Sequence, residues 1–198
     1  GTFDITIANV KGKKVDVITS VGDKHLGGRR FDEEIINLID KKYKKAKGKG
    51  LVKPLEDESL FTIAERIKKI LSTKDKASEI IEGPKGPQKI DISRNEFENS
   101  IDTYIEKIKM LMEEALDRKD LKANNISQTL LVGGSTRIPI INKVITKIMK
   151  KAPVKGVNVD EAVACGAAIY AGLQNKGGLN SAQRKSLSNV ELNDVCNF

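Results

Sequence analysis

Segments with strand-type alternation and segments with helical periodicity follow one another along this chain in an order that constrains its fold. Residues 2–9 and 13–20 alternate apolar and polar side chains, and a hairpin turn is predicted over residues 9–12. Two further strands are predicted over residues 77–82 and 88–92, on either side of a turn that contains two glycines and a proline. The strand pairs lie far apart in the sequence, so other elements must separate them.

Helical periodicity occupies most of the chain between and after these strands. Predicted helices cover residues 31–47, 60–71, 93–115, 139–148 and 158–168. The third is opened by a capping box of Ser93 and Glu96. The last consists of small residues, which predicts close packing on a neighbour and a buried thiol at Cys165. The order of elements predicts an α/β sheet domain interrupted by a smaller α+β insertion over residues 30–102.

The composition indicates a folded protein and excludes several classes. Apolar residues make up 39% of the 198 residues, aromatic residues only 4%, so an aliphatic core is expected. No apolar run reaches the roughly 18 residues of a membrane span, and no signal peptide is visible. The two cysteines and the single histidine form no metal-binding or Cys–His catalytic pattern. A reducing compartment, the cytoplasm, is expected; an organelle stays open because the chain does not begin with Met.

The net charge of +8 raises the alternative of a nucleic-acid-binding protein. Most of the excess comes from lysines within residues 41–49 and 147–155. Only Tyr43 lies among the first group, whereas stacking on single strands requires several aromatic side chains. A solvated basic helix end is therefore the favoured interpretation, and a nucleic-acid-binding module is kept as the outside alternative.

The strongest local motif is Leu-Val-Gly-Gly-Ser-Thr-Arg-Ile-Pro at residues 131–139. A strand of the buried type is predicted over residues 129–132, followed by two glycines and at once by a helix. Glycines let the backbone approach a ligand closely, and a helix N-terminus offers free N–H groups to a phosphate or a ribose. Arg137 would then stack on an adenine. A tight turn with Arg137 in a surface ion pair explains the pattern equally well.

Three weaker patterns accompany this motif. Gly-Thr-Phe-Asp at residues 1–4 heads a strand, and Gly27-Gly28 follows the second strand. Glu65, Lys68 and Ser72 share one helix face, where they could bind a ribose and a purine edge or form an ordinary polar surface. Neither a Walker-type phosphate loop nor a GxGxxG motif occurs in the chain.

Taken together, five motifs resemble the nucleotide-binding domain of the seventy-kilodalton heat-shock chaperones, of the DnaK type. They are residues 1–4, 25–32, 65–72, 131–139 and 160–168, in the family's order and near its spacing. The resemblance covers almost the whole chain. It implies one lobe, the second, of an actin-like ATPase fold of the ribonuclease H-like class, with a mixed sheet and an inserted smaller α+β subdomain.

The resemblance also implies subdomain bounds and site residues. Residues 1–29 and 103–175 would form the larger α/β subdomain, residues 30–102 the inserted one and residues 176–198 a linker-like tail. The implied nucleotide-binding residues are Gly1, Thr2, Glu65, Lys68, Lys69, Ser72, Gly133, Gly134, Ser135, Arg137 and Asp160. Asp4, Gly27 and Gly28 would lie near the phosphates and the metal. The cofactor would be ATP or ADP, with magnesium in the intact domain; no catalytic residue and no direct metal ligand is assigned here.

By resemblance, ATP binding and hydrolysis in the intact parent drive the binding and release of unfolded polypeptides, with a J-domain co-chaperone and a nucleotide exchange factor as partners. Nucleic acid and membranes are not expected partners. The first lobe and its catalytic lysine are expected outside this chain, which alone is not expected to hydrolyse ATP. The chain departs from the family at Lys69, usually arginine, and at Arg29-Arg30, usually acidic. Open alternatives are an exchange-factor or holdase relative with little turnover and a metabolic kinase of the actin superfamily.

Overall fold

The computed structural model describes residues 1–154, 158–174, 176–188 and 190–193, and these form two compact units. Unit 1 comprises Gly1–Phe3, Lys24–Ile108 and Arg137–Val144. Unit 2 comprises Asp4–Asp23, Lys109–Thr136 and the described residues from Ile145 onward. Helices α4 (Asp102–Asp117) and α5 (Pro139–Met149) contribute residues to both units.

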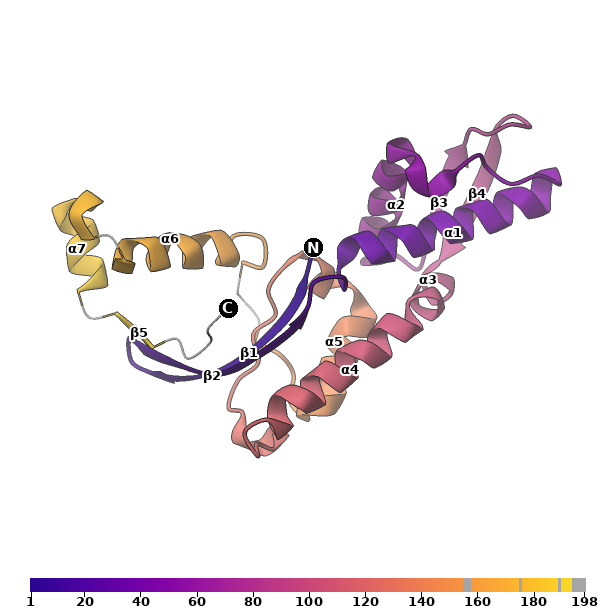
Figure 1. Cartoon of the computed structure of the whole chain (residues 1–198). Helices are drawn as coiled ribbons and strands as arrows, with labels where there is room; N and C mark the ends of the chain where they lie inside the picture. The colour runs from indigo at the N-terminus through magenta and orange to yellow at the C-terminus, as the bar shows by residue number, and fades with distance from the viewer. Residues whose placement is uncertain (155–157, 175, 189, 194–198) are drawn as a thin grey trace. The chain divides into compact units, whose positions relative to one another are not determined.

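Unit 1 is built around α1, a helix of 20 residues that packs on α2, on α3 and on a two-stranded sheet (Figure 1). Its elements are α1 (Gly28–Lys47), the 3-10 helix η1 (Pro54–Glu56), α2 (Glu58–Leu71), β3 (Lys76–Ile81), β4 (Gln88–Ser93) and α3 (Arg94–Ser100). Helix α1 ends where predicted, because Gly48 adopts a left-handed conformation with φ 76° and its N–H bonds to the carbonyl of Lys44.

The core of unit 1 is mostly aliphatic, as the composition predicts. Helix α1 buries Phe31, Ile35, Ile36, Ile39 and Tyr43 along one face. Facing them, α2 and the sheet bury Leu60, Ala64, Ile67, Leu71, Ala77, Ile81, Ile90 and Ile92. Isoleucine is the most frequent residue of this core, in keeping with the low aromatic content of the chain.

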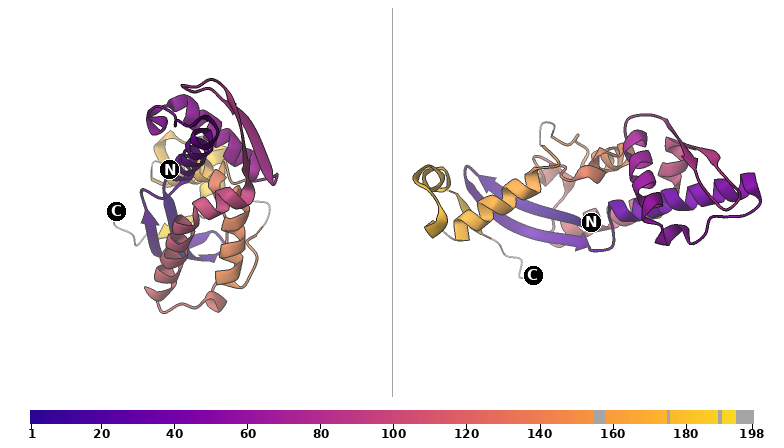
Figure 2. Two further views of the ribbon diagram at one scale, coloured as in Figure 1. Left: turned by 90° about the vertical axis from the view of Figure 1, so that its right-hand side faces the viewer. Right: turned by 90° about the horizontal axis from the view of Figure 1, so that it is seen from above.

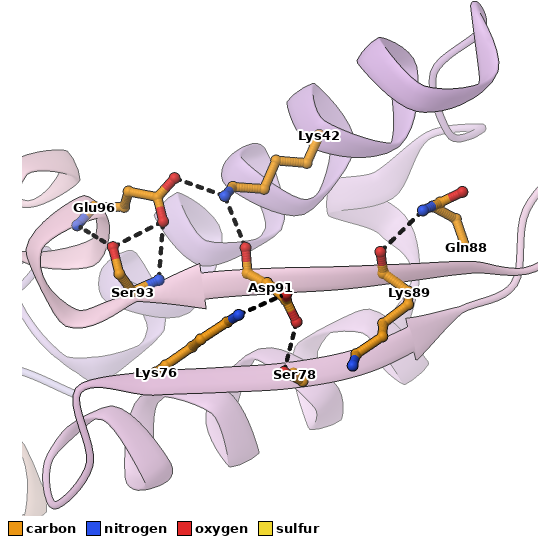
Figure 3. Close-up of polar contacts among 8 residues, drawn as sticks. All are labelled: Lys42, Lys76, Ser78, Gln88, Lys89, Asp91, Ser93 and Glu96. Atoms are coloured by element: carbon orange, nitrogen blue, oxygen red, sulfur yellow. Dashed lines mark hydrogen bonds and ion pairs between the residues drawn. The ribbon is translucent and has the colours of Figure 1, made fainter.

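Strands β3 and β4 form the predicted hairpin, paired antiparallel from Lys76↔Ser93 to Ile81↔Gln88. A network of polar contacts joins the hairpin to α1 (Figure 3). The Lys42 ammonium lies 2.6 Å from Glu96 and donates to the carbonyl of Asp91 at 2.7 Å. Across the strands, the Asp91 carboxylate binds Lys76 at 2.7 Å and accepts from Ser78.

The capping box of Ser93 and Glu96 is confirmed, with both of its reciprocal hydrogen bonds present. The helix that it opens is shorter than predicted. It ends at Ser100, Ile101 adopts φ −100° and ψ 9°, and α4 starts at Asp102. The apolar stripe continues through the break, because Phe97, Ile101, Ile105 and Ile108 are all buried. Sequence periodicity alone therefore joined two helices into one.

Unit 2 contains a mixed three-stranded sheet in the order β1-β2-β5. Strands β1 (Phe3–Lys11) and β2 (Lys14–Asp23) form the predicted hairpin, seen from two directions in Figure 2. Its turn lies at residues 12–13 and not over residues 9–12, because the left-handed conformation that it needs is adopted by Gly12, with φ 62°. Strand β5 (Glu191–Asn193) pairs in parallel with β2. The segment expected to be a linker thus contains this strand and a short helix, α7 (Ser181–Leu187).

Two predictions in unit 2 are wrong. Residues 129–132 form no strand; their backbone contacts include a bond from Val154 N–H to the carbonyl of Thr129, and Leu130 is 57% exposed. Helix α6 (Ala162–Gln174) is exposed along most of its length, and so is the thiol of Cys165. The first prediction assumed a neighbouring strand and the second a surface for α6 to pack on, and the described residues supply neither. The remaining elements are η2 (Ala123–Asn125), η3 (Gly134–Arg137) and η4 (Lys176–Gly178).

Candidate functional site

The backbone at Gly1 lies against the start of helix α1. A Cβ atom placed on Gly27 would overlap the carbonyl oxygen of Gly1 and come within 2.7 Å of its carbonyl carbon. Only glycine permits this approach, because every other residue would push the two segments apart. Two glycine motifs that are 26 positions apart in the sequence (residues 1 and 27) therefore meet at one corner of unit 1.

The N-terminus of α1 points its free N–H groups to this corner. Gly27 occupies the N-cap position, and no side chain caps the helix. The first turn contains no acidic residue and instead carries Arg29 and Arg30. Cations at the positive end of a helix dipole are unfavourable, and Glu33 and Glu58 offset part of this charge. An anion such as a phosphate would compensate both the dipole and the uncapped amides.

Each of the two arginines has partners within unit 1: acidic side chains for both, and an aromatic ring for Arg29. Arg30 binds Glu33 at 2.6 Å, which raises the pKa of the Arg30 guanidinium. Arg29 stacks on the ring of Phe61, with its guanidinium carbon 4.2 Å from the ring centroid, and lies 3.7 Å from Glu58. Cation–π stacking of this kind fixes the side chain on the surface of α2.

Lys68 connects helix α2 to the same corner. Its ammonium donates to the carbonyl of Gly28 at 3.1 Å and to Asp32 Oδ2 at 2.9 Å. Asp32 Oδ1 lies 2.8 Å from the same nitrogen, yet outside hydrogen-bond geometry, so this buried oxygen has a charge contact without a directed donor. Burial raises the pKa of Asp32 above its ordinary value, and Lys68 opposes the rise. The buried pair thus positions Lys68 next to Gly28.

The other predicted residues of α2 lie at its surface or its end. Glu65 and Lys69 form an exposed ion pair at 2.9 Å, one helical turn apart. This pair and the adjoining Lys68 charge lower the pKa of Glu65. Ser72 caps the helix and donates its hydroxyl to the carbonyl of Lys68 at 2.9 Å. Glu65, Lys68 and Ser72 therefore each have a polar partner already in place.

The glycine motif at residues 133–137 forms a turn that belongs to two units. Gly133 adopts φ 92°, a conformation that favours glycine, and its N–H donates to the carbonyl of Val159 at 2.8 Å. Val159 directly precedes Asp160 in the chain, so the partner of Gly133 is the neighbour of Asp160. The Asp160 N–H in turn donates to Asn158 Oδ1 at 3.2 Å. Gly133, Gly134, Ser135, Asp160 and Asp4 belong to unit 2.

Arg137, in contrast, belongs to unit 1, together with Gly1, Thr2, Gly27, Gly28, Glu65, Lys68, Lys69 and Ser72. Its side chain is exposed. Within unit 1 the structure joins residues from three distant segments, through the Gly1–Gly27 contact and the Lys68–Gly28 hydrogen bond.

Sequence reasoning missed Asp32. The signal was present, because Asp32 occupies a position on the buried face of α1, next to Phe31 and one turn before Ile35 and Ile36. A carboxylate on an apolar helix face is rarely buried without a partner. Lys68, its partner, lies 36 residues further along the chain, and no local pattern connects them.

Comparison with known proteins identifies the family of this chain. The family model described as Hsp70 protein matches residues 1–198. The chain belongs to the Hsp70 family. A chaperone protein DnaK from Thermosipho africanus (strain TCF52B) is 35% identical over 199 aligned residues, which cover 97% of this chain and 33% of the relative. A chaperone protein dnaK from Emiliania huxleyi is 36% identical over 181 residues, covering 87% of this chain and 29% of the relative.

This Hsp70 chain therefore spans about a third of the length of the curated relatives it matches. The ATPase domain of Hsp70 proteins has an actin-like fold, and the mixed α/β architecture described above is consistent with it. Among the described residues, none of the helices combines the length and apolar character needed to cross a bilayer. Within the same residues, no group of three or more His, Cys, Asp or Glu side chains is arranged to hold a metal ion.

Proposed function

We propose that this chain is the nucleotide-binding half, the second lobe, of a chaperone ATPase domain. The observation that carries the proposal is the corner formed by Gly1, Gly27 and Gly28. Closely packed glycines meet an uncapped helix N-terminus whose first turn is cationic. These features together suit the phosphates of ATP or ADP.

The adenosine side of the nucleotide is assigned to α2. Lys68, held at Gly28 by Asp32, would lie between the phosphates and the ribose, with Glu65 and Lys69 on the same helix and Ser72 at its C-cap. Arg137, Gly133, Gly134, Ser135 and Asp160 complete the proposed set through the family resemblance, and Thr2 and Asp4 lie next to Gly1 in the chain. Magnesium, when bound with the nucleotide, neutralises phosphate charge.

The activity of the whole protein is part of the proposal. In it, ATP binding and hydrolysis would drive the binding and release of polypeptide clients, assisted by a J-domain co-chaperone and a nucleotide exchange factor. The names of the relatives support the chaperone assignment. The free thiol of Cys165 suits the reducing cytoplasm, the proposed location. The chain alone is proposed not to turn ATP over, because phosphoryl transfer requires positioning and charge neutralisation from several sides.

Calorimetric titration with adenosine, AMP, ADP and ATP tests the proposal. We expect weak binding, with a Kd of about 0.1 mM or higher, so that the binding free energy is no more favourable than roughly −5.5 kcal/mol. ADP should bind more tightly than adenosine, and ADP and ATP should differ little. Equal affinities for adenosine and ADP would contradict a phosphate site at Gly27.

Two variants make the test specific. Gly27→Ala should remove the advantage of ADP over adenosine, whereas Gly166→Ala, in open space on α6, should leave it unchanged. Arg137→Ala should weaken all four ligands by about 1 kcal/mol, the size of a cation–π contact. Indifference of every ligand to Arg137→Ala would show that the adenine lies elsewhere.

A further inference from the structure

A surface at the far end of α1 holds most of the net charge of this chain. Residues 40–53 contain seven lysines and one aspartate, a net charge of +6 out of the +8 of the whole chain. The segment lies entirely within unit 1. Its charge plays no part in the proposed nucleotide site, which lies at the opposite end of the same helix, around Gly28.

The carboxylates next to this segment are already engaged. Asp40 accepts a hydrogen bond from the Leu51 N–H at 2.6 Å. Glu96 binds Lys42 at 2.6 Å, and Glu56 binds Lys53 at 2.8 Å. Five other lysines of the segment have no carboxylate within ion-pair distance in the continuous described stretch 1–154: Lys41, Lys44, Lys45, Lys47 and Lys49. The last four lie in the final turn of α1 or just after it.

The β3–β4 turn adds a fifth lysine to this surface. The Tyr43 hydroxyl donates to the carbonyl of Gly86 at 2.8 Å and accepts from the Lys85 N–H at 3.0 Å. Gly83 packs between Tyr43 and Leu51 so tightly that a Cβ atom there would lie 2.6 Å from the Tyr43 ring. The end of α1, the loop after it and the hairpin turn therefore meet around Tyr43. We call the resulting group of Lys44, Lys45, Lys47, Lys49 and Lys85 the lysine tip.

Exposed apolar side chains adjoin the lysine tip. Val52, in the loop that follows Lys49, is 68% exposed, and Leu55, in η1, is 46% exposed. Glu82 is an exposed carboxylate before the hairpin turn, and the five lysines outnumber it. A ligand that satisfies this whole surface must carry several negative charges and also apolar groups.

We propose that the lysine tip is a docking surface for an acidic segment of a partner protein, one in which carboxylate and apolar side chains alternate. The proposal goes beyond nucleotide binding and does not depend on it. Carboxylates complement the unpaired ammonium groups, and the apolar side chains of the same segment cover Val52 and Leu55.

Nucleic acid fits this surface less well. Tyr43, the aromatic residue of the segment, is fully buried and cannot stack on a base. The tip contains lysines and no arginine, so it lacks the planar fork that binds phosphates and guanines in bidentate fashion. The two exposed apolar side chains would have no partner on a phosphate backbone.

Fluorescence anisotropy on the full 198-residue chain tests the proposal. The probes are a labelled peptide of repeated Asp-Glu-Leu units, a labelled polyglutamate of equal charge and a labelled 20-base-pair DNA duplex, each at low and physiological salt. We expect the Asp-Glu-Leu peptide to bind most tightly and its affinity to fall as salt rises.

Matched variants separate the tip from the general charge of the chain. Lys44→Gln with Lys47→Gln should weaken binding of the Asp-Glu-Leu peptide about three- to tenfold, as expected for the loss of two surface ion pairs. Lys143→Gln with Lys147→Gln removes the same charge from exposed positions of α5 and should change the affinity less than twofold. Val52→Ser with Leu55→Ser should weaken the Asp-Glu-Leu peptide and leave polyglutamate unchanged.

Three outcomes would overturn the proposal. Equal losses from the two lysine pairs would mean that only the net charge matters. Tighter binding of the duplex, lost with Lys44 and Lys47, would assign the tip to nucleic acid. Absence of binding by either acidic peptide at low salt would leave the lysine tip as a solvated surface.

Discussion

Gly27 and Asp32 are the two residues on which the candidate site depends most. Gly27 leaves space for the backbone of Gly1, and Asp32 fixes the ammonium of Lys68 beside Gly28. Gly27 permits the contact because it has no side chain, whereas Asp32 holds Lys68 through the charge of its buried carboxylate. Their replacement should therefore have different physical consequences, one steric and one electrostatic.

Replacing Gly27 with alanine should separate Gly1 from the start of α1. The added Cβ meets backbone atoms, which cannot rotate away, so we expect a destabilisation of about 1–3 kcal/mol, typical of overpacking. Urea unfolding followed by circular dichroism measures it. Gly166→Ala is the control, because it adds a methyl group in open space within a helix and should be neutral or stabilising. Equal effects of the two variants would refute the close contact.

Replacing Asp32 with asparagine should leave the half-buried Lys68 ammonium without its counter-ion. We expect a loss of about 2 kcal/mol in the free energy of unfolding at neutral pH, because an uncompensated charge stays away from water. Glu65→Gln breaks an exposed pair on the same helix and should cost no more than about 0.5 kcal/mol. If both variants lose the same amount, the Asp32–Lys68 pair is not the buried contact described above.

At the scale of elements, unit 1 is tied together by contacts between α1 and the β3–β4 hairpin. Lys42 of α1 binds Glu96, which also caps α3 through Ser93 (Figure 3). These contacts lower the pKa of Glu96 to about 2, with the Lys42 hydrogen bond as the largest cause. A single carboxylate thus connects a helix, a strand end and the start of the next helix.

Glu96→Gln should flatten the acid side of the stability profile. The pKa of Glu96 is depressed in the folded chain, so its contribution is present above the ordinary glutamate value of 4.5 and is lost as pH falls toward 2. Urea midpoints between pH 6 and pH 2.5 should therefore fall less steeply for Glu96→Gln than for the original chain. Glu113→Gln, at an exposed position of α4, should keep the original slope. Parallel slopes for all three proteins would rule out this role.

The sequence predicted the elements whose signals lie in neighbouring residues, and it missed the contacts between residues that are far apart in the chain. The Gly48 stop, the Ser93–Glu96 capping box and the β3–β4 hairpin all follow from neighbouring residues. Residues 129–132 have the apolar character of a strand, but a strand also requires a neighbouring strand to pair with. The composition of a segment does not show whether such a neighbour exists. The pairing of Asp32 with Lys68 and the meeting of Gly1 with Gly27 depend on the tertiary fold.

At the scale of the whole molecule, two helices run through both units. Residues 105 and 108 of α4 belong to unit 1, Met112 and Ala115 of the same helix belong to unit 2, and all four are buried. Helix α5 likewise has its buried Ile141 in the segment of unit 1 and its buried Ile145 in the segment of unit 2. Unfolding one unit therefore disrupts a helix that the other requires.

We expect a single cooperative unfolding transition for this reason. Far-ultraviolet circular dichroism reports on all helices, and a fluorophore on Cys165, in a Cys196→Ser background, reports on α6 alone. The two probes should give coincident urea transitions. Separate midpoints, with α6 melting first, would show that the exposed helix unfolds on its own.

The third strand of the unit 2 sheet determines when that sheet can be completed. Lys14 of β2 pairs with Glu191 of β5, 177 positions further along the chain, and the pairing extends over three residues. Such a long closure loses more chain entropy than the β1–β2 turn, and three residue pairs return little of it. The β1–β2 ribbon can form early during refolding, whereas β5 must wait for the intervening chain. The edge of β2 consequently stays uncovered through most of the folding reaction, the period in which strand edges are most prone to pair between molecules.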